Sequence, residues 1–175
     1  MLDPTVGIRY SGIELFKGWD LVAEAAVKVP LQGQRDLLST GHTDFGLEAT
    51  LQHFAAHHAY YVSMAAVYYD GTTSISPTPA QVVPTLVLGY EHAFTPDTHL
   101  ILQGYISPSV YSDDETDLKE LKATKYQLSL GFYHRMASGL LSFGVTENLQ
   151  NVDNTPDIGF QLGWAYSPAL KRATN

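Results

Sequence analysis

The sequence predicts an all-β protein in which antiparallel strands form an up-and-down transmembrane β-barrel. Three observations indicate this fold class: apolar and polar side chains alternate along many segments, these segments are long, and short connections alternate with long ones. Alternation with a period of two residues is typical of strands, because successive side chains of a strand point to opposite faces of a sheet. A tilted strand needs about 9–11 residues to cross a bilayer, and the alternating segments are of that order.

The clearest alternation lies near the C-terminus, in PDIGFQLGWAYS (156–167). The apolar parity of this segment consists of Ile158, Phe160, Leu162, Trp164 and Tyr166. The small or polar parity consists of Asp157, Gly159, Gln161, Gly163 and Ala165. The same pattern recurs along 124–135, so we expect one face of the sheet to be apolar and the other polar.

On these grounds nine strands are expected, at 5–14, 20–29, 43–53, 58–69, 85–95, 98–108, 124–135, 139–149 and 157–167. The segment 47–69 leaves an alternative open. It contains no Gly or Pro and is rich in Ala, so it could form a helix instead of a strand hairpin. The outward face of 58–69 is also open, because both parities are apolar or small.

The connections give the expected orientation. The short ones are 16–18, 54–57, 96–97 and 136–138, and they alternate with the longer ones at 30–42, 70–84, 111–123 and 150–156. Outer-membrane barrels have short periplasmic turns, longer extracellular loops and an even number of strands. Nine strands that begin outside break this rule. We therefore expect residues 1–175 to be a single barrel domain that lacks upstream strands and a signal peptide, with 168–175 as a C-terminal tail.

Composition excludes several classes of protein. The net charge of -8, from 10 Lys and Arg against 18 Asp and Glu, argues against a nucleic-acid-binding protein. The chain has no Cys, which excludes disulfides and thiolate metal sites. It contains no run of about 20 apolar residues that would form a membrane helix. Its first residues, Met1–Pro4, have neither the basic nor the apolar region of a signal peptide.

The two parities predict which residues face the lumen and which face lipid. The predicted lumen-lining residues are Arg9, Glu24, Lys28, Glu48, Gln52, Glu91, Gln103, Lys125, Gln127 and Gln161, with either Glu147 or its neighbour Thr146. The predicted lipid-facing or girdle residues are Tyr90, Tyr126, Leu128, Leu130, Phe132, Ile158, Phe160, Leu162, Trp164 and Tyr166. The polar set could line a pore or ligand site, or it could simply fill a small barrel with side chains.

No residue pattern indicates catalysis or a bound metal. His53, His57 and His58 cluster at an expected turn, but no HExxH motif accompanies them. Ser142 is expected on the polar face, but no GxSxG motif surrounds it. The acidic run at 113–115 is expected to be a solvated part of an outer loop. We therefore assign no catalytic residue, no metal ligand and no cofactor.

Three phrases of the sequence carry a resemblance: KVPLQGQRDLLSTGHTDFGLEATLQ (28–52), YQLSLGFYHRM (126–136) and FGVTENLQNVDNTPDIGFQLGW (143–164). In this order they resemble an uncharacterised outer-membrane β-barrel family of Gram-negative bacteria, which is classified as a domain of unknown function. The resemblance implies architecture and location without an established activity. It also implies a longer N-terminal part, with a signal peptide and further strands.

The expected function is therefore that of an integral outer-membrane β-barrel protein of a Gram-negative bacterium, with a structural or passive pore role and no enzymatic activity. Its expected partners are membrane lipid and the barrel assembly machinery, and not nucleic acid. Two alternatives remain. One is a soluble barrel that binds an apolar ligand, as lipocalins do, with the apolar parity inside. The other is an outer-membrane enzyme.

Overall fold

The fold is a single antiparallel sheet. A computed structural model describes residues 3–30, 42–70, 81–111, 117, 122–149 and 158–166. The strands are β1 (Thr5–Phe16), β2 (Trp19–Lys28), β3 (Asp44–Phe54), β4 (His58–Tyr69), β5 (Val82–Thr95), β6 (Thr98–Ser107), β7 (Lys125–Met136), β8 (Gly139–Asn148) and β9 (Ile158–Tyr166). They lie side by side in the order of the sequence, and each pairs antiparallel with the next. The predicted all-β meander of nine strands is confirmed.

Three of the expectations concern residues that the structure does not describe. The acidic run at 113–115, the position of Asp157 and the C-terminal tail at 168–175 lie outside the described residues.

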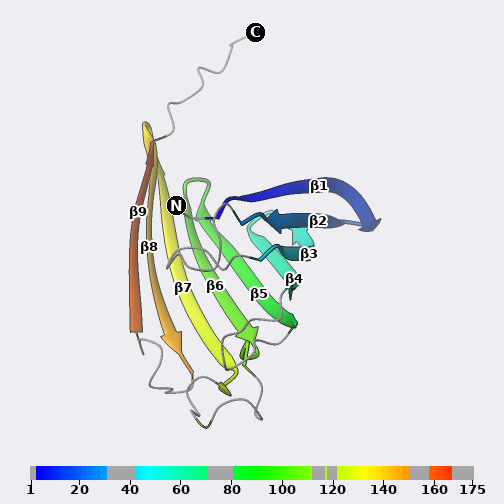
Figure 1. Ribbon diagram of the computed structural model, residues 1–175. Helices are drawn as coiled ribbons and strands as arrows, with labels where there is room; N and C mark the ends of the chain where they lie inside the picture. The colour runs from blue at the N-terminus through cyan, green and yellow to red at the C-terminus, as the bar shows by residue number, and fades with distance from the viewer. Residues whose placement is uncertain are drawn as a thin grey trace.

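The sheet is curved and open. Figure 1 shows β1–β3 turned away from the plane of β7–β9, so that the sheet forms the wall of a trough. Among the described residues, β1 pairs only with β2, and β9 pairs only with β8. The closed ring of a barrel is therefore not seen. All other strands have a partner on both sides.

Short turns lie at one end of the sheet. They are Lys17–Gly18, 55–57, 96–97 and 137–138, and the longer connections 29–43, 70–81, 108–124 and 149–157 lie at the other end. At the first turn, Gly18 has φ of +77°, a conformation that glycine adopts without steric cost. Its N–H donates to Glu14 Oε1 at 3.0 Å. The predicted alternation of short and long connections is confirmed.

The segment 47–69 forms a strand hairpin rather than a helix. β3 and β4 pair continuously from Asp44 opposite Tyr69 to Phe54 opposite Ala59. The turn closes with a hydrogen bond from Ala55 N to His58 O at 2.8 Å. Among the described residues, no helix is both long and apolar enough to span a membrane.

The two faces of the sheet differ in exposure as well as in polarity. The buried side chains are Val22, Asp44, Ser63, Val83, Ser107 and Asn148, and the strand register places all six on the polar face. By contrast, Phe160 is 76% exposed and Leu162 is 77% exposed on the other face. Side chains converge on the concave side of a curved sheet and spread apart on its convex side. The polar face is therefore concave and the apolar face convex.

Candidate functional site: the polar concave face

The register tests whether each predicted set of residues shares a face. Residues directly opposite each other in an antiparallel pair point to the same side. Arg9 lies opposite Glu24, which lies opposite Glu48. Following such rows across the sheet places all ten predicted lumen-lining residues on the concave face, and all ten predicted lipid-facing residues on the convex face. The shared faces are structural facts, and the lumen and lipid assignments stay predictions.

Two open questions about side-chain direction are resolved by the same rows. In β4, Tyr61 and Ser63 lie opposite Gln52 and Thr50, so this parity faces the concave side. In β8, Thr146 lies opposite Ser129 of β7, with which it shares a hydrogen bond of 2.8 Å. Thr146 therefore belongs to the concave face, and Glu147 lies on the convex face opposite Leu128.

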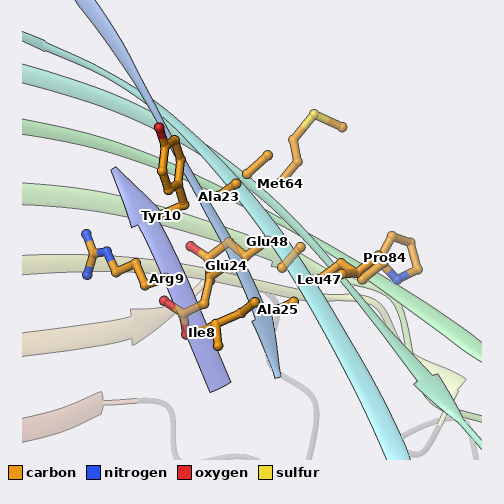
Figure 2. A pocket seen from close by; sticks show the side chains of 13 residues that line it. Ile8, Arg9, Tyr10, Ala23, Glu24, Ala25, Leu47, Glu48, Met64 and Pro84 are labelled. Carbon is orange, nitrogen blue, oxygen red and sulfur yellow. The ribbon is translucent and has the colours of Figure 1, made fainter. Parts of the chain in front are cut away.

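A first polar cluster surrounds Glu48. Ser63 Oγ donates to Glu48 Oε1 at 2.5 Å, and Thr50 Oγ1 lies 3.1 Å from the same oxygen and 3.0 Å from Ser63 Oγ. Glu24 lies directly opposite Glu48, and two like charges in this position repel each other. Arg9 follows on β1 as the next residue of the row, and Figure 2 shows these three side chains on their adjacent strands.

A second cluster surrounds Glu91. Its Oε1 accepts hydrogen bonds from Tyr133 OH at 2.7 Å and lies 2.6 Å from His99 Nδ1. The rings of His99 and Tyr133 stack with centroids 4.5 Å apart and 12° between their planes. These contacts join β5, β6 and β7. Sequence analysis missed His99 and Tyr133, although their parity matches that of the concave face, because only the register shows that they meet Glu91.

Near this cluster, the ring of Tyr61 on β4 lies close to Gly89 on β5. A Cβ built on Gly89 would lie only 1.7 Å from Tyr61 Cζ. Tyr61 therefore lies across the backbone of β5, and no larger residue fits at Gly89 without displacing the ring.

A third polar contact lies at the end of the sheet with the long connections. Lys28 Nζ forms an ion pair with Asp44, which is 7% exposed. Thr85 Oγ1 donates to Ser107 Oγ at 3.2 Å at the same end of β5 and β6. These contacts bind neighbouring strands to each other on the concave side.

The convex face carries a groove. It has a volume of about 690 Å³ and crosses β1–β5 (Figure 2). Small side chains shape it, because Ala23, Ala25, Ala49 and Ala66 face outward there. Tyr10 and Met64 are among the larger convex side chains that line it.

A belt of aromatic rings crosses the convex face near the short turns. Trp19 stacks on His53 at a centroid distance of 5.0 Å, and Tyr60 lies 5.3 Å from Tyr90. The remaining ring pairs of the belt are Phe16 with Trp19, His53 with Tyr60, His58 with Tyr60, Tyr90 and His92, and His92 with Phe94. Trp164 and Tyr166 lie at the same end of β9.

In the predicted histidine cluster, His53 and His58 both lie near the Tyr60 ring, with centroid distances of 6.3 and 6.4 Å, but their other partners differ. His53 joins Trp19, whereas His58 Nδ1 lies 2.8 Å from Tyr90 OH and 3.4 Å from His92 Nδ1. In the part of the chain that the structure describes, no group of three or more His, Cys, Asp or Glu side chains could hold a metal ion. Ser142 lies opposite Tyr133 and Gly163 in the ladder. Two hydroxyls lie beside basic groups, Thr98 Oγ1 at 2.8 Å from His134 Nδ1 and Ser63 Oγ at 2.5 Å from Glu48 Oε1, and each of these contacts joins neighbouring strands of the sheet.

Comparisons with known proteins add one finding. A search of curated proteins returned no similar sequence. The profile of a family described as "Protein of unknown function (DUF3187)" matches residues 16–167, a span that contains β2–β9 in full. Because this match covers most of the chain, the protein belongs to that family of unknown function, DUF3187.

Proposed function

We propose that this chain forms the wall of an outer-membrane β-barrel in a Gram-negative bacterium, with a polar lumen and a structural or passive pore role. The observation that carries this proposal is the inverted polarity of the curved sheet. Its convex face exposes large apolar side chains such as Leu130, whereas its concave face buries polar ones such as Ser63 and Asp44. A soluble protein gains stability by the opposite arrangement, because apolar area in water is unfavourable by roughly 25 cal/mol per Å².

The arrangement along the strands also supports a membrane position. The middle of the convex face is apolar, with residues such as Leu102, Leu128 and Val145. The aromatic belt follows at the end with the short turns. Membrane barrels carry an apolar band flanked by aromatic girdles, because amphipathic rings prefer the level of the lipid headgroups.

The curvature counts against the lipocalin-like alternative. A soluble barrel that binds an apolar ligand would direct its apolar parity inward, toward the concave side. Here that side carries Glu24, Glu48 and Glu91. An enzyme has no comparable support, because Glu48 and Glu91 bond to hydroxyl or imidazole groups that belong to the sheet itself.

Cell fractionation tests the location. We expect the full-length protein to sediment with outer membranes, to resist extraction by salt, and to dissolve only with detergent. An unboiled sample should migrate faster on an SDS gel than a boiled one, because a folded barrel binds less detergent. A monodisperse protein in aqueous buffer without detergent would contradict the proposal.

Single-cysteine labelling tests the faces. The chain contains no Cys, so each introduced thiol is the only reactive one. Ser129→Cys and Leu130→Cys place it on neighbouring positions of β7 that face opposite sides. We expect a membrane-impermeant maleimide to label position 129 through the lumen and to spare position 130 in intact membranes. Both should react equally after denaturation in SDS. The reverse order of labelling would contradict the assignment of the faces.

A further inference from the structure

The concave face contains a hollow. This cavity of about 230 Å³ lies against β6–β9. Gly131 and Gly144 lie opposite each other in its wall. Besides Ile101, the side chains that reach it from the concave face are Gln103, Ser129, Tyr133, Ser142, Thr146 and Gln161. The wall of the hollow is thus largely apolar, with hydroxyl and carboxamide groups distributed along it, and none of its lining side chains is ionised.

Several of these polar groups are available to a ligand. Ser129 Oγ and Thr146 Oγ1 bond to each other at 2.8 Å, which leaves each hydroxyl with acceptor capacity. Within the described residues, no hydrogen bond engages the carboxamides of Gln103 and Gln161 or the hydroxyl of Ser142. A carboxamide offers two donors and an acceptor oxygen. The hollow therefore presents donors and acceptors together.

Tyr133 supplies a fixed wall. Its ring stacks on His99, and its hydroxyl donates to Glu91 at 2.7 Å. His99 is held by the same carboxylate at 2.6 Å. The position of the Tyr133 ring is therefore set by two contacts that lie outside the hollow, and a ligand would not need to order it.

Packing does not explain the glycines of this hollow. A Cβ on Gly131 would meet no atom closer than Ile101 Cβ at 3.6 Å, and one on Gly144 none closer than Leu130 O at 3.7 Å. Both are ordinary contacts, so alanine would fit at either position. Glycine weakens a strand relative to alanine, and its presence often marks a place where a ligand approaches the backbone.

We propose that this hollow binds a neutral polyhydroxylated ligand, such as one sugar unit of a saccharide, against the backbone of Gly131 and Gly144. Sugar hydroxyls donate and accept hydrogen bonds, which matches the carboxamides and hydroxyls of the lining. A charged solute would leave its charge without a partner there, which is unfavourable in a partly desolvated site. The inference deepens the proposed function, on which it rests for the role of the lumen, by naming the class of solute.

Saturation-transfer difference NMR on the purified, folded full chain tests the inference. Glucose and N-acetylglucosamine serve as neutral probes, and glucose 6-phosphate serves as the charged one. We expect saturable signals from the neutral sugars and a weaker response from the phosphate. Gly144→Ala should weaken sugar binding by roughly tenfold or more, because the added methyl group takes space that the ligand would occupy.

Gly46→Ala is the matched control, because Gly46 lies on the same face of β3, where an added Cβ would be 4.0 Å from its nearest neighbours. Its sugar binding should equal that of the original protein. Gly131→Ala provides a second variant, and circular dichroism confirms that each variant is folded. Absence of saturable binding by either neutral sugar, equal binding of the charged probe, or an equal loss in all variants would overturn the inference.

The result separates the two proposals. A protein that fractionates with the outer membrane but binds no sugar would lose this inference and keep the proposed function. A protein that binds neutral sugars through Gly144 but remains in the soluble fraction would lose the proposed function and keep the site.

Discussion

The concave and convex faces of this sheet are stabilised in different ways. On the concave face, side chains of different strands bond directly to each other, as Ser63 does with Glu48 and Tyr133 does with Glu91. On the convex face, many large side chains are exposed, and Leu162 is 77% exposed. The concave face therefore carries its own polar contacts, whereas the convex face, outside the aromatic belt near the short turns, depends on its surroundings to cover it. Substitutions on the two faces should differ accordingly.

The largest difference is expected for a charge placed on each face. Leu130→Arg puts a cation in the middle of the convex side of β7, and we expect it to lower the free energy of unfolding in lipid vesicles by about 2–4 kcal/mol. Ser129→Arg puts the same side chain on the concave side, beside polar groups, and should cost clearly less. Urea titration of both variants in the same vesicles measures the difference. Equal losses would mean that the convex face does not contact lipid.

A smaller difference is expected for a methyl group added to each face. Gly89→Ala on the concave face forces Tyr61 to move, and overpacking of this kind lowers the free energy of unfolding by about 1–3 kcal/mol. Gly104→Ala lies on the convex face of β6, where no atom lies within 4 Å of an added Cβ. Its effect should stay within about 0.5 kcal/mol. Chemical denaturation measures both, and a tolerant Gly89 would show that Tyr61 moves freely.

The extent of the sequence prediction can be judged from particular strands. Period-two alternation located all nine strands, but it misplaced the start of the fifth, which was expected after Pro84 and begins at Val82. Pairing of β5 with β6 starts only at Leu86, opposite Ile106. At Pro84 the side of β5 that faces β6 is therefore an unpaired edge, and a proline, which has no backbone N–H, is tolerated there. In β1, the register shifts between Tyr10 and Ile13, around Gly12 with φ of +99°. A parity count cannot detect such a bulge, because the added residue reverses the faces.

The sequence predicted which face of the sheet carries the candidate site, but not which of its residues contact each other. Parity assigned Glu48 and Glu91 to the polar side from the sequence alone. Their partners Ser63, His99 and Tyr133 come from other strands, and which residues meet depends on the register. Register follows from turn geometry and from the pairing of whole strands. The hollow at Gly131 and Gly144 was missed for the same reason, because these glycines lie 13 positions apart (144 - 131) and only pairing brings them together.

A third test concerns the hydrogen bond under Glu48. Ser63→Ala removes a hydroxyl that is 6% exposed and leaves the carboxylate with one donor fewer, so we expect a loss of about 1 kcal/mol in the free energy of unfolding. Glu48→Gln alters the other partner of the same hydrogen bond. The effects of Ser63→Ala and Glu48→Gln on the free energy of unfolding should therefore not add in the double variant, because both substitutions act on one contact. A double-mutant cycle measured by urea denaturation gives the coupling. Simple additivity would mean that the contact does not stabilise the sheet.

The smallest effect is expected at the rim. Lys28→Gln removes the ion pair with Asp44 near the end of β2, where the lysine side chain is 23% exposed and the aspartate side chain is 9% exposed. Glutamine keeps an amide N–H donor for the buried carboxylate, which limits the cost of the substitution. We expect a loss of about 1 kcal/mol or less in the free energy of unfolding, part of which salt screens. We expect the loss to be measurable at low ionic strength and to shrink in about 1 M salt. A loss that does not depend on salt would point to packing of the lysine side chain instead.

The pairing of each strand with only its neighbours in sequence has a consequence for the order of assembly. Contacts between strands occur only between consecutive strands of the described sheet. Every hairpin can therefore form with a closure entropy set by its own connection, and a doubled loop length adds only about 0.6 kcal/mol. The sheet can grow one strand at a time, in the order in which the chain is delivered. In the described sheet, the outer edges of β1 and β9 are then the last ones to be covered.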